Sequence, residues 1–335
     1  MRWLIAMVTG LFVLWSGYWI VGSRAVLSAV RTWVQNAPEQ GLSITTGDIT
    51  LAGYPNRFDL TVTDPQYADP VTGWSWRAPF VQALALSYKP WSVIVALPNE
   101  QTVSRPGEAI TIASDQMRAS MAVFPQSDLG LDTIIVEGDA IALTSDLGWA
   151  GSVKHSVIAL RRDPSRTTTY EFGLQLDDLT PDPAFSAALA STSDLPAVIR
   201  SVTADIFADL SAPLDRNAAQ THPQLDRVDI QNVLINWGKL AIHAKGALAP
   251  DENGLAEGRI GIEVTNWQLL VPLLVATGVV KPELSETAGN MMAAMAKSGA
   301  DPDKLVLPLT LADGWMSLGP FPLGPAPAMR AQAGL

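Results

Sequence analysis

A long stretch without charged side chains at the start of the chain limits what this sequence can fold into. Residues 3–22 read WLIAMVTGLFVLWSGYWIVG and contain no Asp, Glu, Lys or Arg. As an α-helix, this stretch would rise ~30 Å, which matches the hydrocarbon core of a bilayer. Trp3 lies near one end and Trp15 and Trp19 near the other, as expected for amphipathic rings at the two membrane interfaces. The stretch therefore predicts a membrane-spanning helix.

Three interpretations of this stretch compete. A buried core helix would rarely be apolar on every face, and a cleaved signal peptide has a shorter apolar region followed by small residues. Here the apolar run ends in Tyr-Trp-Ile-Val-Gly, which is a poor cleavage site. We favour an uncleaved signal anchor over residues 1–24, with residues 25–335 forming the body. We expect the helix to continue over residues 21–36 and to end near Pro38 and Gly41.

The side of the membrane on which the body lies is less strongly encoded. Arg2 precedes the apolar stretch and Arg24 and Arg31 follow it, so the positive-inside rule barely decides the orientation. The chain has no cysteine, which fits an oxidising compartment and excludes disulfides, thiol catalysis and cysteine zinc sites. We expect an inner-membrane protein with a single span and its body in the periplasm.

Charge excludes one class of partner. Lys and Arg number 22 against 33 Asp and Glu, a net charge of −11 without any basic block. Nucleic-acid binding requires clustered cations, so we predict no nucleic-acid partner. The same balance disfavours broad adhesion to an anionic membrane surface, so a membrane link must be hydrophobic insertion through the N-terminal helix.

The body is dominated by alternation of apolar and polar residues, which is typical of half-buried strands. Residues 53–56, Gly-Tyr-Pro-Asn, are a turn signal between two such runs, so a β-hairpin is predicted there. We predict a mainly β (α+β) fold with a large antiparallel, curved or groove-like sheet, because its strands are joined by short turns. Further strands are predicted at residues 83–88, 92–96, 109–113, 118–123, 131–136, 140–144, 153–160, 168–176, 202–210, 227–236, 239–247 and 255–264.

Helices are few and the end of the chain is rich in proline. We predict helices at residues 182–190, 267–279 and 282–297, the last ending near Gly299. The segment 318–327 contains four prolines in LGPFPLGPAP and is expected to be extended rather than helical or an interior strand. One elongated body domain is the default, with residues 41–125 as a possible sub-lobe.

The sequence contains no recognisable catalytic or metal-binding motif. His155, His222 and His243 are far apart, and neither a nucleophile elbow, a phosphate loop nor a dinucleotide fingerprint is present. The acidic residues are scattered, mostly at turns. We therefore predict no catalytic residue, no metal and no cofactor, and a protein that is not an enzyme.

Aromatic residues are the more unusual feature and supply the ligand-binding candidates. As a strand, residues 73–77 would place Trp74 and Trp76 on one face, either as core cover or as an amphipathic platform. Arg57 beside Tyr54 is either a turn cap or an anion contact, and Trp267 opens an apolar helix. Tyr54, Arg57, Trp74, Trp76 and Trp267 are the candidate ligand-binding residues.

Several motifs along the chain resemble those of a known family. Residues 49–60 (ITLAGYPNRFDL), 73–79 (GWSWRAP), 88–94 (YKPWSVI), 307–309 and 318–327 are similar to those of a Gram-negative envelope family, domain of unknown function 2125. Tyr54-Pro55-Asn56 stands where the family often has Phe-Pro-Phe. The resemblance implies an envelope placement and architecture but no activity. More distantly, an anchor followed by a β-rich meander looks like the AsmA-like envelope proteins, which are thought to form β-grooves that handle lipid.

Three functional hypotheses follow. The leading one is a membrane-tethered protein that binds a phospholipid or acyl chain in envelope homeostasis. The alternative is an assembly module that binds another envelope protein through a sheet edge or the proline-rich tail. The third is a hydrolase whose site has no recognisable motif.

Overall fold

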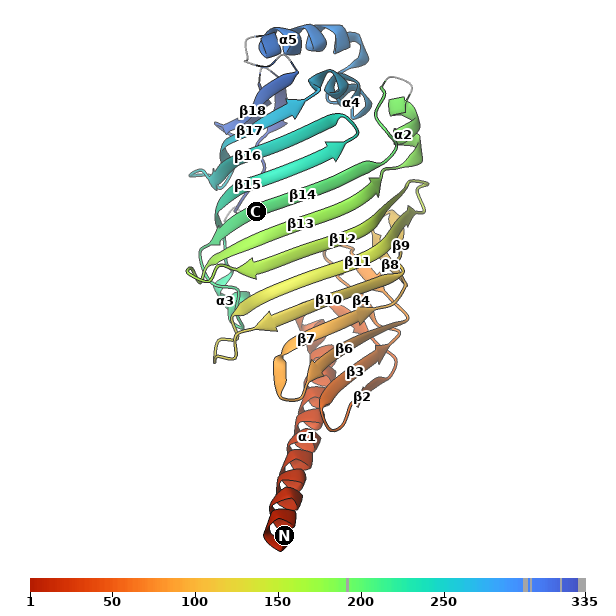
Figure 1. The fold of residues 1–335 in the computed structure, drawn as a ribbon, viewed down its shortest axis with the longest axis vertical. Coiled ribbons are helices and arrows are strands. Elements are labelled where there is room, and N and C mark those ends of the chain that lie inside the picture. The colour runs from red at the N-terminus through yellow and green to blue at the C-terminus, as the bar shows by residue number, and fades with distance from the viewer. Residues whose placement is uncertain (191–192, 298–300, 302, 320, 331–335) are drawn as a thin grey trace. The chain divides into compact units, whose positions relative to one another are not determined.

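The computed structural model describes residues 1–190, 193–297, 301, 303–319 and 321–330. The chain divides into two compact units, one comprising residues 1–123 and 136–148 and the other residues 124–135 and 149–335. Residues 41–123 of the expected sub-lobe fall in the first unit. Both units are built of antiparallel strands with few helices, which confirms the predicted mainly β class (Figure 1).

The N-terminal stretch forms one long helix. Helix α1 (Arg2–Asn36) is followed by the 3-10 turn η1 (Ala37–Gln40), so the predicted helix end is confirmed. Gly41 ends the turn with a φ of 76°, and its N–H donates to the carbonyls of Ala37 and Pro38. Glycine adopts this left-handed conformation without steric cost, which explains why the chain leaves the helix there.

The strands of the first unit form two antiparallel ladders. At three points the chain passes between the ladders through short interruptions that contain Pro65, Pro79 or Pro98. Proline has no N–H to donate to a ladder, so each proline ends the regular pairing at that point. One ladder runs β2 (Ile49–Ala52), β3 (Arg57–Thr63), β6 (Phe80–Leu86), β7 (Lys89–Leu97), β10 (Gln116–Val123). The other runs β1 (Ser43–Thr45), β4 (Gln66–Ala68), β5 (Ser75–Arg77), β8 (Glu100–Arg105), β9 (Glu108–Ala113) and the end of β11 (Leu131–Ser145).

Two strand predictions in this region were wrong. Lys89 and Pro90 were expected to separate two strands, but β7 begins at Lys89 and the turn lies before it. The pairing of β7 with β10 starts only at Ser92, so Pro90 is not required to donate a hydrogen bond in that ladder. Residues 131–136 and 140–144 belong to the single strand β11, which continues through a left-handed Ala140 with φ 50°. The hairpin of β2 and β3 around residues 53–56 is confirmed.

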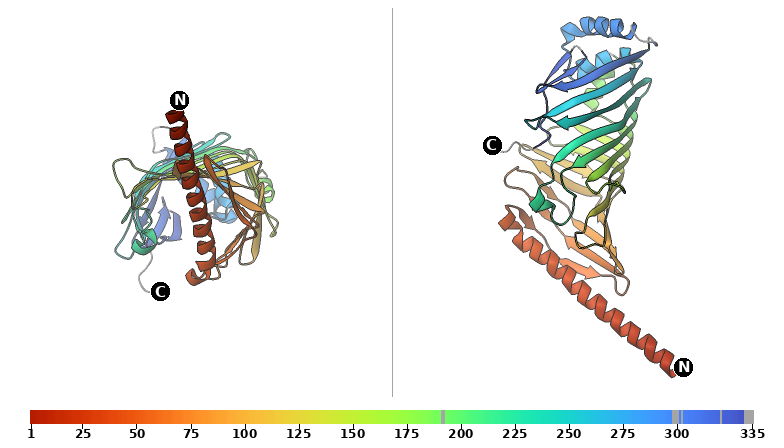
Figure 2. Two further views of the ribbon diagram at one scale, coloured as in Figure 1. Left: turned by 90° about the horizontal axis from the view of Figure 1, so that it is seen from below. Right: turned by 90° about the vertical axis from the view of Figure 1, so that its left-hand side faces the viewer.

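The second unit is an antiparallel meander in which each strand pairs with the next along the chain. The strands are long, and β12 to β17 lie side by side (Figure 1). Figure 2 shows them following a curve with α4 on its inner side. The strands are β12 (Ala150–Arg162), β13 (Thr169–Thr180), β14 (Ile199–Leu210), β15 (Leu225–Trp237), β16 (Leu240–Pro250), β17 (Ala256–Thr265), β18 (Lys304–Ala312), β19 (Trp315–Leu318) and β20 (Phe321–Pro325).

Helices cover one end of this sheet. They are α2 (Pro183–Ala190), α4 (Leu270–Ala276) after the 3-10 turn η2 (Trp267–Leu269), and α5 (Ser285–Lys297) after η3 (Pro282–Leu284); a short α3 (Ala218–Thr221) lies elsewhere. All three predicted helices are thus present, although two open as 3-10 turns. Met292 and Leu270 pack with Trp237, Leu240 and other buried side chains of the strands in one hydrophobic core. The helix end near Gly299 lies outside the described residues.

The proline-rich segment is extended, as predicted, and its end is held against the second unit. Strand β20 pairs with β19, and the Ala256 N–H then donates to the Pro327 carbonyl at 2.8 Å. The Arg330 guanidinium pairs with Asp226 at 2.5 Å. Pro320 and residues 331–335 lie outside the described residues.

The close approach of β16 to β17 generates a stability prediction. Gly246 lies opposite Ile260, and a Cβ on Gly246 would come within 2.3 Å of the Arg259 carbonyl oxygen. We expect Gly246→Ala to lower the free energy of unfolding by about 1–3 kcal/mol because the backbones must separate. In the matched control Gly261→Ala, the new Cβ would lie 3.7 Å from its nearest neighbour, an ordinary contact. Chemical denaturation followed by circular dichroism measures both, and equal losses would contradict the argument.

Candidate functional site

The sheet of the second unit has one apolar face, which the strand register defines. Ile158 lies opposite Leu174, Leu174 opposite Ala204, and Ala204 opposite Val233. Successive side chains of a strand point to opposite faces, so partners in register share a face and form rows across the sheet. The apolar face of β12 to β15 consists of Ile158, Leu160, Phe172, Leu174, Leu176, Val202, Ala204, Ile206, Ile230, Val233 and Ile235.

The opposite face of the sheet, including β16, β17 and β18, is polar and carries ion pairs. His243 on β16 lies opposite Glu263 on β17, and the Lys304 ammonium contacts Glu263 at 2.7 Å. The Arg227 guanidinium lies 2.7 Å from Asp229 on the same strand. A sheet with one wet face needs cover only on the other face, so the question is what covers the apolar side.

The helices cover the apolar face only in part. Trp237 and Leu240, at the end of the face next to α4 and α5, are buried in the hydrophobic core. Further along the strands, Leu174 and Val233 are half-buried, and Ile158 is 40% exposed. A buried core residue would be almost wholly enclosed by its neighbours. The middle of this face is therefore an apolar surface with incomplete cover.

In the first unit, α1 is attached to the β2–β3 turn by aromatic side chains. The Trp19 ring lies edge-on to Tyr54 at 5.4 Å and stacks on Phe58 at 6.0 Å between centroids. The Trp15 indole donates to the Pro55 carbonyl at 3.0 Å, and the Trp19 indole donates to the Arg57 carbonyl at 2.8 Å. Buried Trp N–H groups usually find such acceptors, so these bonds fix how the helix meets the turn.

The predicted ligand residues lie in different surroundings. Tyr54 takes part in the contact with α1, and the Arg57 side chain is 57% exposed and paired with Asp59 at 2.7 Å. The Trp76 indole, on β5, donates to the Gln101 side-chain oxygen at 3.0 Å. These three belong to the first unit, where Tyr54 lies in the β2–β3 turn and Arg57 directly follows it.

Trp74 and Trp267 lie in contrasting surroundings, one exposed and the other buried. Trp74 lies just outside β5 and is 45% exposed, so Trp74 and Trp76 do not share one strand as the alternation predicted. Trp267 is only 7% exposed and packs in the hydrophobic core of the second unit. Burial favours a packing role for Trp267, and a ligand role for any of the five stays a prediction.

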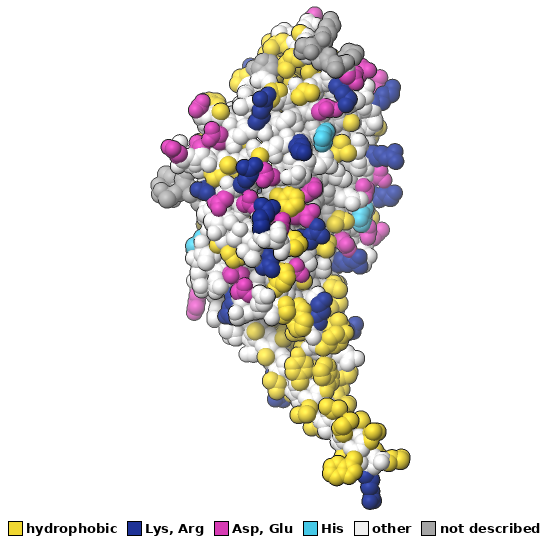
Figure 3. All heavy atoms as spheres, turned by 60° about the vertical axis from the view of Figure 1, so that its left-hand side comes forward, with side chains coloured by type: hydrophobic (Ala, Val, Ile, Leu, Met, Phe, Trp, Pro, Cys, Tyr) yellow, Lys and Arg dark blue, Asp and Glu magenta, His cyan; other side chains and the backbone are white. Residues whose placement is uncertain are grey.

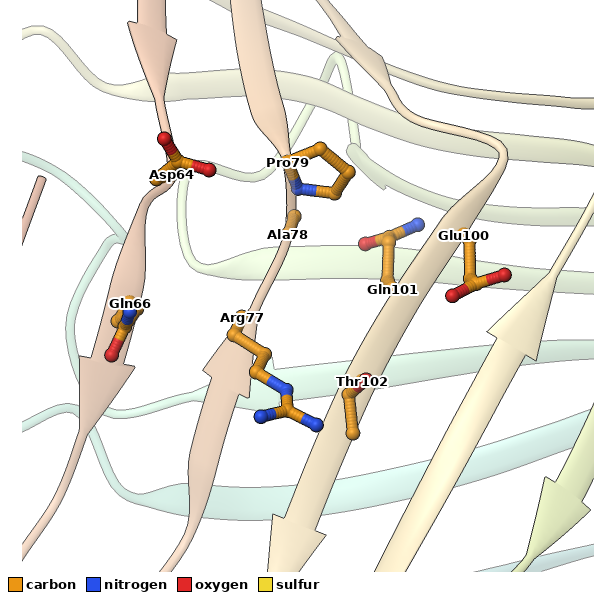
Figure 4. Close-up of a pocket in the computed structure, with 8 residues that line it drawn as sticks. All are labelled: Asp64, Gln66, Arg77, Ala78, Pro79, Glu100, Gln101 and Thr102. Atoms are coloured by element: carbon orange, nitrogen blue, oxygen red, sulfur yellow. The ribbon is translucent and has the colours of Figure 1, made fainter. Parts of the chain in front are cut away.

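A polar pocket of about 390 Å³ lies where the two ladders of the first unit meet (Figure 4). Asp64, Arg77 and Glu100 are its charged lining residues. Asp64 lies in the bend between β3 and β4 and Glu100 begins β8, and their carboxylates do not point toward one another (Figure 4). Acid–base catalysis requires groups that converge on one reacting atom, and these three do not converge. Among the residues that the structure describes, no His, Asp and Glu cluster could hold a metal ion.

The shifted pKa values have structural causes. The pKa of Asp163 falls to about 2 because the Ser165 side chain and backbone N–H, and then Arg166, hydrogen-bond its carboxylate in a turn. Burial raises the pKa of Tyr170, whose hydroxyl accepts a hydrogen bond from the Leu214 N–H at 2.8 Å. Both groups support loops of the second unit.

The fold and these surfaces define a class: an open antiparallel β-sheet protein with a partly covered apolar face and an N-terminal helix long and apolar enough to cross a membrane. A family model described as "Uncharacterized protein conserved in bacteria (DUF2125)" matches residues 19–327. The chain belongs to this family, as the motifs predicted. A search of the curated proteins found no match.

Alternation along the strands could have revealed the apolar face before the structure was known. Residues 172–176 and 202–206 already place apolar side chains at every second position. The cover of that face has no comparable signal, because α2 lies between β13 and β14 in the chain and α4 and α5 lie between β17 and β18, yet they share one core with Trp237 of β15.

The Tyr170 hydrogen bond generates a second stability prediction. Tyr170 is 1% exposed, so Tyr170→Phe would leave the Leu214 N–H without its acceptor inside the protein. We expect the free energy of unfolding to fall by about 1–3 kcal/mol. Tyr88→Phe is the matched control, because Tyr88 is 60% exposed and should tolerate the change. Chemical denaturation curves measure the free energy of unfolding of both variants. An unchanged stability of Tyr170→Phe would contradict a stabilising role for its hydrogen bond with Leu214.

Proposed function

We propose that this protein binds lipid on the apolar face of its second unit while α1 anchors it in a membrane. The observation that carries the proposal is the row of Ile158, Leu174, Ala204 and Val233, which is apolar throughout and incompletely covered. Soluble monomers rarely leave large contiguous apolar patches without a partner. An acyl chain is a partner with matching chemistry, because aliphatic side chains offer it contacts without polar groups that would be left unpaired.

The driving force for such binding is large enough. Burying ~14 methylene groups at ~0.8 kcal/mol each would supply ~11 kcal/mol before the entropic cost of association. Hydrophobic burial of this kind requires no catalytic group. The proposed role is therefore binding and handling of lipid in envelope homeostasis, not catalysis.

We also propose that α1 lies in the inner membrane and that the body lies in the periplasm. The uncharged run of residues 3–22 supports membrane insertion, and the lack of cysteine fits an oxidising compartment. In this arrangement the sheet would receive lipid from the same bilayer that holds the helix.

The assembly-module alternative receives less support from the end of the sheet. Strand β20 carries Pro322 and Pro325, which cannot donate to an added strand. The tail after it is already occupied by its contacts with Ala256 and Asp226. Strand addition at this edge is therefore disfavoured.

Site-specific photocrosslinking tests the lipid-binding face in the full-length protein in its membrane. Phe172 lies on the apolar face opposite Ile206, whereas Phe207, on the neighbouring strand, lies on the opposite face. Each is replaced in turn by benzoylphenylalanine, which differs from phenylalanine only by the added benzoyl group. We expect lipid adducts at position 172 in at least several-fold excess over position 207.

Mass spectrometry of the irradiated, purified protein measures the adducts. Circular dichroism of both variants checks that the sheet is retained. Equal adduct yields at the two positions, or no lipid adduct at position 172, would sink the proposal. A protein adduct at position 172 in place of lipid would instead support the assembly module.

A further inference from the structure

An apolar pocket lies in the first unit, on the face of β3, β6 and β7 opposite to Phe58, the side chain against which α1 packs. It has a volume of about 330 Å³, and its floor is formed by Leu84, Leu86 and Ile94. Leu84 and Ile94 are partners in the register of β6 and β7, so they project from the same face. The cations Arg57 and Lys89 line the same pocket. An apolar floor bordered by two cations is complementary to an amphiphile with an anionic head.

The surroundings of this pocket are also apolar and exposed. Leu86 is 38% exposed and Ile94 is 48% exposed, and Tyr54 and Tyr88 in the adjoining turns are 47% and 60% exposed. Figure 3 shows hydrophobic side chains continuing from α1 onto the adjoining end of the first unit, with Lys and Arg side chains beside them. Exposed aromatic and aliphatic side chains at turn tips, with basic side chains beside them, are suited to a membrane interface.

Hydrogen bonds to α1 fix the level of these turns along the helix. The Tyr18 hydroxyl donates to the Ser87 carbonyl at 2.6 Å, and Trp15 and Trp19 donate to the carbonyls of Pro55 and Arg57. Tryptophan and tyrosine at the end of a membrane span prefer the headgroup level. These aromatic residues bond to the turns directly. When α1 spans the bilayer, the turns and the pocket next to them therefore lie at the level of the lipid headgroups.

The charges of the pocket favour an anion. Arg57 and Lys89 contribute two positive charges and Asp59 one negative charge, so the local sum is 2 − 1 = +1, against −11 for the chain. Asp59 contacts one terminal nitrogen of the Arg57 guanidinium, which leaves donors on the rest of the group. A guanidinium with free donors binds phosphate oxygens in forked geometry, and an ammonium adds a point charge.

We propose that this pocket binds the headgroup of an anionic phospholipid from the bilayer that holds α1. Arg57 and Lys89 contact the phosphate, and Leu84, Leu86 and Ile94 contact the glycerol and the upper part of the acyl chains. The inference rests on the membrane anchoring in the proposed function and adds a headgroup-selective site to it. The pocket is a lipid site of the first unit, separate from the apolar face of the second.

Native mass spectrometry of the full-length protein tests the site. The protein is reconstituted in nanodiscs of equal phosphatidylglycerol and phosphatidylcholine and released into mild detergent. We expect retained phosphatidylglycerol to exceed phosphatidylcholine at least several-fold. In Arg57→Gln/Lys89→Gln the ratio of phosphatidylglycerol to phosphatidylcholine should fall to that of the nanodisc, because the phosphate contacts are lost. The backbone carbonyl of residue 57 still accepts the hydrogen bond from Trp19, so the junction with α1 is retained.

Matched controls separate the site from overall charge. Arg118→Gln/Lys154→Gln removes the same charge from two exposed ion pairs elsewhere and should leave the ratio unchanged. Lys89→Gln alone leaves the Arg57 pair with Asp59 intact and should lower the ratio in part. Leu86→Ser/Ile94→Ser removes apolar contacts from the floor and should reduce the amount of phosphatidylglycerol retained.

Each outcome decides one of the two proposals. No enrichment in the wild-type protein, or an unchanged ratio in Arg57→Gln/Lys89→Gln, would overturn the headgroup site. If lipid adducts at position 172 persist in that case, the proposed function stands without it. If enrichment depends on Arg57 and Lys89 while position 172 gives no adduct, the headgroup site stands and lipid binding on the second unit fails.

Discussion

The architecture of the second unit depends on the need to cover the apolar face of its sheet, which its helices meet only in part. In β12 to β15, alternation places apolar side chains on one face and ion pairs on the other, so water is tolerated on one side only. Helices α4 and α5 satisfy this requirement near Trp237 and Leu240 by forming a buried core. Beyond the part of the face that the helices cover, Leu174 and Val233 stay half-buried, and this is where we propose that lipid binds.

The junction between α1 and the first unit has a comparable importance. The indoles of Trp15 and Trp19 satisfy carbonyls of the β2–β3 turn, and Gly22 lies so close to Phe58 that a Cβ would approach its ring within 2.9 Å. The helix is thus joined to the sheet by hydrogen bonds and close packing. If α1 spans a bilayer as proposed, the turns of the first unit would lie at the membrane surface, at the level of the lipid headgroups.

Local signals in the chain predicted most of the elements, and the errors have physical explanations. The alternation around residues 109–123 and the turn at residues 53–56 produced the expected strands, because side-chain period and turn chemistry are local properties. Pro90 was misplaced because a proline is tolerated in a strand wherever its N–H is not needed. Residues 137–139 were read as a break, but Ala140 adopts a left-handed conformation and β11 continues.

By itself, the sequence determined the apolar helix, the antiparallel β class and the amphipathic character of the strands. Each of these follows from residue spacing within a few turns or strands. Tertiary structure alone decided that Trp267 is buried, that Arg57 and Lys89 border one apolar pocket, and that helices cover only part of the apolar face. Burial and convergence depend on which distant segments meet, and contacts between distant segments leave no periodic pattern in a single chain.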